Sequence, residues 1–172
     1  MAEPGEMVTV VDEHDNPIGT KLRADVTHND IYRVTALWLT NSRGDVLLAQ
    51  RGFHKKNNPG QWGPAVAGTV NAGESYEANI VKEVFEELGL QNIALTPLLK
   101  KFTDDGSWRY FCQFYTAVIN RPANAFVIEV ENIEQVAWFA SAQLLTELQS
   151  NPTKFVPTAH LWPELLQGAE SL

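Results

Sequence analysis

Cysteine is almost absent from this chain, since Cys112 is the only one among 172 residues. An intramolecular disulfide needs two cysteines, and cysteine-rich zinc sites need at least that number. Both are therefore excluded as sources of stability. Cys112 falls within an aromatic, β-rich stretch. We expect it to be a buried thiol in the core.

Long apolar runs and an excess of positive charge are also missing. No stretch approaches the roughly 18 apolar residues of a membrane span, and the N-terminal segment has no basic region followed by an apolar run, so no secretory signal is expected there. The formal net charge of −8 argues against a basic patch that binds nucleic acid. We therefore expect a cytoplasmic protein with neither a membrane nor a nucleic-acid partner. The negative charge does not argue against a small phosphorylated substrate, because acidic clusters hold cations that attract phosphate.

The composition is that of one globular domain. Hydrophobic residues make up 44% and charged residues 20% of the chain, which is ordinary for a folded domain of this length. No internal repeat, low-complexity tract or linker-like stretch divides the sequence. We therefore predict a single domain over residues 1–172.

Strand and helix patterns alternate along the chain. A polar turn at 12–16 separates two short strands, which predicts a β-hairpin within residues 1–30. Pro59 and Gly60 mark the segment 54–63 as a loop. The mixture predicts an α/β fold around a mixed sheet, with C-terminal helices within residues 140–172. The expected strands are 8–11, 17–22, 34–40, 46–50, 65–70, 94–102, 108–119 and 136–139, and the expected helices are 75–88, 140–148 and 159–168.

The helix expected at 75–88 has clear end signals. Ser75 is suited to the N-cap, Glu77 to the positive end of the helix dipole, and Gly89 to a left-handed C-terminal cap. Each helical residue turns by about 100°, so two separate faces are predicted. The face expected to meet the core carries Ile80, Val81, Val84, Phe85 and Leu88.

The other face of this helix carries three acids. Glu83, Glu86 and Glu87 fall within an arc of about 100°. Carboxylates so close together repel one another, and hard cations such as Mg²⁺ or Mn²⁺ remove that repulsion. The competing interpretation is a solvated acidic face, as in many Glu-rich helices.

The residues around this face resemble the Nudix box, G-x5-E-x7-R-E-U-x-E-E-x-G-U, where U is a bulky aliphatic residue. Lys82 stands where the pattern has Arg and is the one departure. Several fixed positions in one short segment make the match highly specific. The resemblance implies a Nudix α/β/α sandwich with a mixed central sheet and an N-terminal hairpin extension, in which residues 68–90 form the box loop and helix. The matching positions are Gly68, Glu74, Glu83, Val84, Glu86, Glu87, Gly89 and Leu90.

The resemblance also implies roles for these residues. Glu83, Glu86, Glu87 and the Gly68 carbonyl would bind Mg²⁺ or Mn²⁺. Glu74 is the fourth residue of the expected catalytic set: it would hold the loop against the helix by contacting the residue at the Arg position of the box. Lys82 can pair with Glu74 only as a point charge, without a bidentate fork. Gly73 would permit the tight turn into the helix. Lys82, Gly73 and Gly89 are thus expected to have structural roles that hold the box loop and helix in shape.

The implied reaction is attack of water on phosphorus in a diphosphate linkage. The metal would neutralise developing charge and lower the pKa of water, and a carboxylate would act as the general base. Glu83 is one candidate for the base. The family also draws the base, or a further metal ligand, from a distant loop. The acids that leave this choice open are Asp104, Asp105, Glu129, Glu131 and Glu134.

Residues that precede the box suggest how a substrate is bound. Arg51, Lys55 and, with less weight, Lys56 have the charge to bind phosphates, although solubilising surface charge explains them as well. Aromatic side chains can stack on a nucleobase, but core packing is commoner for aromatics in strands. The aromatic residues concerned are Trp62, Trp108, Tyr110 and Phe111.

The motif Arg51-x3-Lys55-Lys56-x2-Pro59-Gly60-x-Trp62 is similar to the stretch before the box in type I isopentenyl-diphosphate isomerases and their hydrolase relatives. In our alignment the isomerase's catalytic cysteine falls near Ala67, a metal-binding histidine near Tyr32, and its acidic pair near Ser107 and Arg109. The side chains present there cannot supply the proton donor and acceptor that isomerisation needs.

The leading hypothesis is therefore a hydrolase acting on a nucleoside diphosphate linked to another group, or on a nucleoside di- or triphosphate. One rival is a Nudix module that senses nucleotides without cleaving them, which Lys82 favours and the intact glutamate set opposes. The other rival is the isomerase. Oligomeric state stays open, although the family often forms homodimers.

Overall fold

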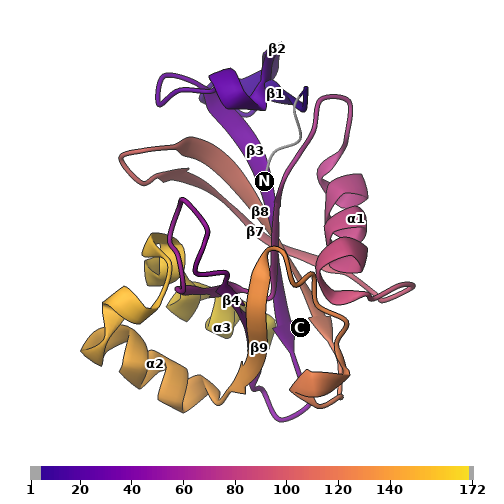
Figure 1. Cartoon of the computed structure of the whole chain (residues 1–172), viewed down its shortest axis with the longest axis vertical. Helices are drawn as coiled ribbons and strands as arrows, with labels where there is room; N and C mark the ends of the chain where they lie inside the picture. The colour runs from indigo at the N-terminus through magenta and orange to yellow at the C-terminus, as the bar shows by residue number, and fades with distance from the viewer. Residues whose placement is uncertain (1–4, 171–172) are drawn as a thin grey trace.

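The computed structural model describes residues 5–170 (Figure 1). Within this range, no helix is both long enough and apolar enough to cross a bilayer. Short 3₁₀ turns occupy Arg23–Asp25, Ala123–Ala125, Pro152–Lys154 and Pro157–Leu161. The strands and helices are β1 Met7–Val11, β2 Pro17–Leu22, β3 Ile31–Thr40, β4 Val46–Arg51, β5 Trp62–Pro64, β6 Val66–Thr69, α1 Tyr76–Leu88, β7 Thr96–Asp104, β8 Arg109–Val118, β9 Ile133–Phe139, α2 Ser141–Ser150 and α3 Trp162–Glu170.

Strand β3 is the centre of the sheet. It pairs in parallel with β8 along its whole length and antiparallel with β6. It meets β4 only at its C-terminal end, through Leu39↔Leu47 and Thr40↔Val46. Strand β4 then pairs with β5 and β9 instead. The sheet therefore divides into the strands β6, β3, β8 and β7 on one side and the strands β9, β4 and β5 on the other.

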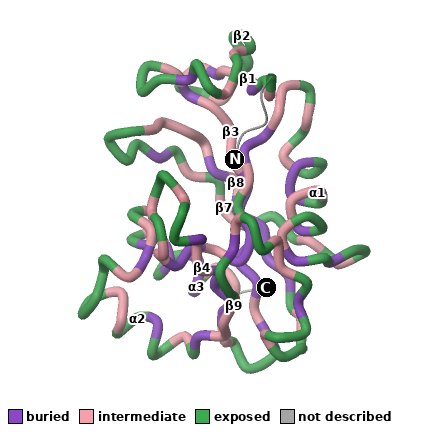
Figure 2. The backbone as a smooth tube through the Cα atoms, viewed as in Figure 1, coloured by how far each residue is buried: buried purple, intermediate pink, exposed green. Residues whose placement is uncertain are grey.

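Helices cover both faces of this divided sheet, with α1 on one side and α2 and α3 on the other (Figure 1). Successive residues of β3 point to opposite faces. Leu37 belongs to the core beneath α1, together with Ile80 and Val84. Trp38 belongs to the core beneath α2 and α3, where its ring centroid lies 5.5 Å from that of Trp162. Figure 2 shows buried segments along the central strands and on the side of α1 that faces them. The predicted α/β/α arrangement around a mixed sheet is confirmed.

Helix α1 has the predicted ends but a narrower core-facing stripe. Ser75 Oγ accepts a hydrogen bond from the Ala78 amide at 3.1 Å, and Gly89 adopts a left-handed φ of 66°. Ile80, Val84 and Leu88 are buried as predicted. The prediction was wrong for Val81 and Phe85, which are 59% and 51% exposed. Val81 and Phe85 each follow a buried residue by one position and so point about 100° away from it. The sheet covers only part of the circumference of the helix, so these two side chains stay outside the core.

Three other predictions needed correction because strand partners and prolines set the boundaries. The predicted loop 54–63 was wrong at its end, where strand β5 begins because Trp62 pairs with Gln50 of β4. The predicted strand 65–70 is confirmed as β6, which pairs with β3. Strand β9 begins at Ile133 because it pairs with Arg51. The last predicted helix, 159–168, divides into a 3₁₀ turn and then α3. Pro163 is the second residue of α3, a first-turn position that proline tolerates.

The predicted N-terminal hairpin is confirmed as β1 and β2, and its turn is tied to the rest of the protein by Asp15. Arg33 Nε on β3 lies 2.7 Å from Asp15 Oδ1. Lys100 Nζ on β7 and the Tyr76 hydroxyl at the start of α1 lie 2.6 and 3.0 Å from Oδ2. The Asp15 side chain is only 8% exposed. Burial alone would raise the pKa of Asp15, but hydrogen bonds from Lys100, Arg33 and Tyr76 lower it below its usual value.

Asp15→Asn is expected to lower the free energy of unfolding at pH 7 by about 1.5–3 kcal/mol, because it removes a charged acceptor from three donors. A carboxyl whose folded pKa is depressed contributes stability above its unfolded pKa of about 3.9 and loses it as the pH falls through the folded value. The variant should therefore show a smaller loss of stability between pH 7 and pH 3. Urea unfolding at both pH values measures this, with Asp25→Asn, an exposed acid beyond β2, as control. Parallel pH profiles of wild type and Asp15→Asn would contradict the assignment.

Candidate active site

The box loop and α1 meet where Gly68 of β6 faces Glu83. A Cβ atom placed on Gly68 would lie 2.2 Å from Glu83 Cδ and 2.6 Å from its Oε1. A real Cβ atom essentially never lies within 3.0 Å of another non-bonded heavy atom. Only glycine therefore allows the Glu83 carboxylate to pack directly against the backbone of β6.

Lys82 lies between the two acids that the box places around it. Its Nζ is 3.0 Å from Glu74 Oε1 and 3.3 Å from Oε2. The same atom is 3.5 Å from Glu83 Oε1. The lysine therefore acts as a single charge shared by Glu74 and Glu83. Glu74 Oε2 also accepts the Asn71 backbone N–H at 3.0 Å, which ties the loop to the helix.

Asn79 is a residue of this site that the sequence analysis missed. Its side chain is fully buried, and its amide nitrogen lies 3.0 Å from the Thr69 carbonyl oxygen. The same nitrogen lies 3.1 Å from Glu74 Oε2 and 3.3 Å from Glu83 Oε1. Its Oδ1 accepts the Thr35 hydroxyl at 2.5 Å. The available signal was an amide one helical turn before Glu83 and next to the core residue Ile80.

Glu87 lies deeper than the other box glutamates. Burial raises the pKa of its carboxyl to about 8, and the negative charges of Glu83 and Glu129 act in the same direction, against the Ala67 N–H and the charge of Arg51. Ala67 N donates to Glu87 Oε2 at 3.2 Å. Burial, followed by the charge of Glu86, also raises the pKa of Glu83. Burial is the largest cause of both shifts, because it disfavours the charged form of a carboxyl, and the charge of Lys82 opposes the shift at Glu83.

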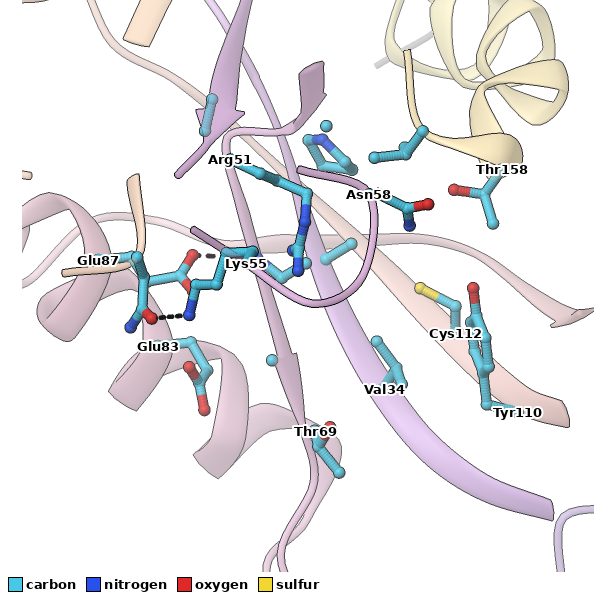
Figure 3. Close-up of a pocket in the computed structure, with 18 of the residues that line it drawn as sticks. Val34, Arg51, Lys55, Asn58, Thr69, Glu83, Glu87, Tyr110, Cys112 and Thr158 are labelled. Carbon is cyan, nitrogen blue, oxygen red and sulfur yellow. Dashed lines mark hydrogen bonds between the residues drawn. The ribbon is translucent and has the colours of Figure 1, made fainter. Parts of the chain in front are cut away.

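These glutamates border a cavity of about 920 Å³. Figure 3 shows Glu83 and Glu87 on the α1 side, with Arg51 at the end of β4 and Lys55 in the loop after it. The structure therefore gathers most of the predicted site residues around one space. Glu74, Gly73 and Gly89 lie outside its lining, as does the exposed Lys56. The predicted residues that line the cavity are Arg51, Lys55, Gly68, Lys82, Glu83, Glu86 and Glu87.

The donor set fits a hard divalent cation. Three carboxylates and nearby backbone carbonyls offer only oxygen ligands, which Mg²⁺ and Mn²⁺ prefer. Within residues 5–170, no three acidic, histidine or cysteine side chains are gathered closely enough to enclose an ion. The chemistry of these donors suits the cation, and the three carboxylates would have to lie closer together to enclose it. Glu83, Glu86 and Glu87 would hold the ion, together with the Gly68 carbonyl.

The distant acids fall into two groups. Glu129 and Asp105 line the cavity, whereas Glu131 and Glu134 are exposed outside it. Asp104 is also outside, where its Oδ1 lies 2.9 Å from His28 Nε2.

Glu129 is the distant acid that lies beside the helix glutamates. Its backbone N–H donates to the Glu87 carbonyl at 3.3 Å. Its carboxylate accepts a hydrogen bond from Asn132 Nδ2. The side-chain oxygen of Asn132, Oδ1, accepts a hydrogen bond from Lys55 Nζ. Asn132 therefore connects Glu129 to a predicted substrate-binding residue.

The four aromatic residues considered for stacking on a nucleobase also divide into those that line the cavity and those that do not. Trp62 is 8% exposed and packs edge-on against Phe139 in the core. Trp108 packs against Tyr32, and Phe111 against Phe102. Tyr110 alone among the four lines the cavity. Cys112 is buried as predicted and also borders this space.

The chain is similar to known proteins in sequence and in fold. A model of the NUDIX domain matches residues 31–159. An uncharacterised Nudix hydrolase of Pseudomonas aeruginosa is 31% identical over 152 residues, which cover 88% of each chain. A crystal structure of a Deinococcus radiodurans protein superposes with a TM-score of 0.74 at 24% identity, over 85% of this chain and 90% of the other.

Isomerases are also similar to this chain. The isopentenyl-diphosphate Delta-isomerase of Citrobacter koseri is 30% identical and covers 89% of this chain and 87% of its own length. Ala67, near which we expect the isomerase cysteine to fall, is exposed beside Gly68. Tyr32, near which we expect the metal-binding histidine, packs against Tyr110. The NUDIX domain model covers most of the chain, and relatives of both names match it over nearly its whole length. This chain belongs to the Nudix family.

Proposed function

We propose that this protein is a hydrolase that depends on Mg²⁺ or Mn²⁺ and cleaves a diphosphate linkage in a small phosphorylated substrate. The proposed substrates are a nucleoside diphosphate linked to another group, or a nucleoside di- or triphosphate. One observation carries the proposal: three helix carboxylates and two cationic side chains, Arg51 and Lys55, line the same cavity. This arrangement can bind a metal and a diphosphate together.

The protein's own groups would divide the work of the reaction. A bound divalent cation neutralises charge on the phosphates and makes water a better nucleophile. Arg51 and Lys55 orient the diphosphate through charge-assisted hydrogen bonds. A carboxylate accepts the proton that the attacking water loses, and Glu83 and Glu129 are the candidates for this base. Lys82 and Asn79 hold Glu83 in place, and Glu74 joins the loop to the helix.

A substrate panel with product identification tests this proposal. The purified protein is incubated with Mg²⁺ or Mn²⁺ and with nucleoside diphosphates, triphosphates and nucleoside-diphosphate sugars. We expect release of phosphate, pyrophosphate or a nucleotide, and loss of turnover when EDTA removes the metal. Turnover that is unaffected by EDTA would contradict the assigned role of the metal. Tight nucleotide binding without any turnover would favour the sensing module.

The isomerase is the second candidate, because several relatives carry that name. Isomerisation requires a proton donor and acceptor on either side of the carbon skeleton, and Ala67 has no ionisable group. Burial strongly raises the pKa of Cys112, which makes it a poor source of thiolate. Incubation of isopentenyl diphosphate with the protein and Mg²⁺ is expected to yield no dimethylallyl diphosphate. Formation of that product would replace the hydrolase proposal.

A further inference from the structure

Asn132 lies where the segment that follows β4 meets the segment that precedes β9. Its backbone carbonyl accepts the Gly52 N–H at 3.0 Å, and its own N–H donates to the Glu129 carbonyl at 3.0 Å. The neighbouring residues Arg51 and Ile133 face each other where β4 pairs with β9. Backbone hydrogen bonds on both sides therefore fix Asn132 between the two segments.

The side chain of Asn132 lies between a cation and an anion. Its Nδ2 donates to Glu129 Oε2, and its Oδ1 accepts a hydrogen bond from Lys55 Nζ. Only one orientation of the amide fits, because an ammonium group can only donate and an ionised carboxylate can only accept. All three residues line the cavity. The amide therefore keeps the two charges apart while it makes a hydrogen bond to each of them.

This separation matters because both charges have a part in the proposed reaction. Lys55 would bind the diphosphate, and Glu129 is a candidate for the base. Opposite charges that can reach one another attract and form a direct ion pair, which would leave less charge on each for the substrate and the attacking water. Within residues 5–170, neither side chain takes part in an ion pair. A neutral amide between them preserves both charges.

We propose that Asn132 is a positioning residue that holds Lys55 and Glu129 at their places on the cavity wall and prevents them from pairing with each other. This inference rests on the proposed function and adds to it a residue outside the Nudix box. Asn132 acts through the two side chains that it holds. Its loss should therefore affect both the binding of the diphosphate and the rate of its cleavage.

Asn132→Leu keeps the bulk of the side chain and removes both hydrogen bonds of the amide. Lys55 is then free to pair with Glu129, so we expect a rise in KM and a fall in kcat for the best substrate of the panel, each roughly three- to tenfold. Asn132→Asp, which keeps the side-chain shape, should act in the same direction, because it gives Lys55 a charged partner and Glu129 a like charge. The matched control is Asn124→Leu, exposed and outside the cavity, which should leave both constants unchanged.

Double variants distinguish positioning from a general loss of stability. The probe for binding is methylenediphosphonate, a diphosphate analogue with a methylene bridge, titrated by calorimetry in Mg²⁺. If Asn132 acts through Lys55, Asn132→Leu should not weaken this binding further in the Lys55→Met protein, because the cation that it positions is gone. Likewise, Asn132→Leu should not lower the residual kcat of Glu129→Gln. Thermal unfolding of each variant measures any folding defect.

Undiminished effects of Asn132→Leu in both double variants would overturn the inference, as would wild-type KM and kcat in Asn132→Asp. The outcome is also decided if the protein hydrolyses none of the compounds in the panel. Weaker binding of methylenediphosphonate to Asn132→Leu, but not to the double variant with Lys55→Met, would then support the positioning role and count against the hydrolase. Unchanged binding in such a protein would overturn both.

Discussion

Glu87→Gln and Glu86→Gln are each expected to lower kcat/KM by at least about 100-fold, the upper range seen when residues that only support metal ligands are changed. Glutamine keeps the shape of the side chain but binds a divalent cation more weakly, because it carries no charge. At position 87 the change also removes a charge that burial disfavours, so the metal-free variant should fold. Steady-state kinetics with the best substrate of the panel, at increasing Mg²⁺, measure the effect.

The control for these variants is Glu134→Gln, the same chemical change on an exposed acid of β9 outside the cavity. It should retain wild-type kcat/KM. Thermal unfolding of each variant without metal separates a folding defect from a catalytic one. Full turnover in both Glu86→Gln and Glu87→Gln would refute the metal-binding role of the helix. Selective loss in one of them would show which carboxylate holds the ion more strongly.

Asn79→Leu is expected to lower kcat/KM about 10- to 100-fold and the free energy of unfolding by about 1–3 kcal/mol. Its amide nitrogen donates toward both Glu74 and Glu83, which share the single charge of Lys82. Together, Asn79 and Lys82 supply the hydrogen-bond donors that the guanidinium group of an arginine at position 82 could supply alone. Loss of the amide leaves Glu83 held by Lys82 only. The effect should appear in kcat and in the Mg²⁺ concentration needed for half-maximal rate.

Two further variants distinguish positioning of Glu83 from a general loss of stability. Thr35→Val removes the hydrogen bond that Asn79 Oδ1 accepts, and Thr35 bonds to neither glutamate. It should reduce stability with little change in kcat. Adding Lys82→Arg to Asn79→Leu should restore part of the activity, because the fork of arginine can reach both acids. If Thr35→Val lowers kcat as much as Asn79→Leu does, the amide is structural only.

The relation to isomerases is a matter of side chains on a shared scaffold. The cavity lies where β3 stops pairing with β4 and pairs with β6 instead. This change of strand partner is a property of the backbone and does not depend on the side chains of Ala67 or Tyr32. Of the four positions near which we expect the isomerase residues, Ala67 lines the cavity, whereas Tyr32, Ser107 and Arg109 do not.

Local sequence determined the helix that carries the glutamates. Ser75 and Gly89 set the ends of α1, and the spacing of Glu83, Glu86 and Glu87 set their common side, because capping and helical periodicity depend on neighbours in the chain. The match to the Nudix box was likewise a property of one continuous segment. The isolated strand patterns were enough for the fold class.

Only the tertiary structure decided which distant residues join that helix. Glu129 and Asp105 line the cavity while Glu131 and Glu134 do not, and nothing in their local sequences separates them. The same holds for Asn79, whose partners come from β3, the end of β6 and the box loop, and for the exposure of Val81 and Phe85. Such choices depend on which strands pair and which surface covers a helix, and these contacts join residues far apart along the chain.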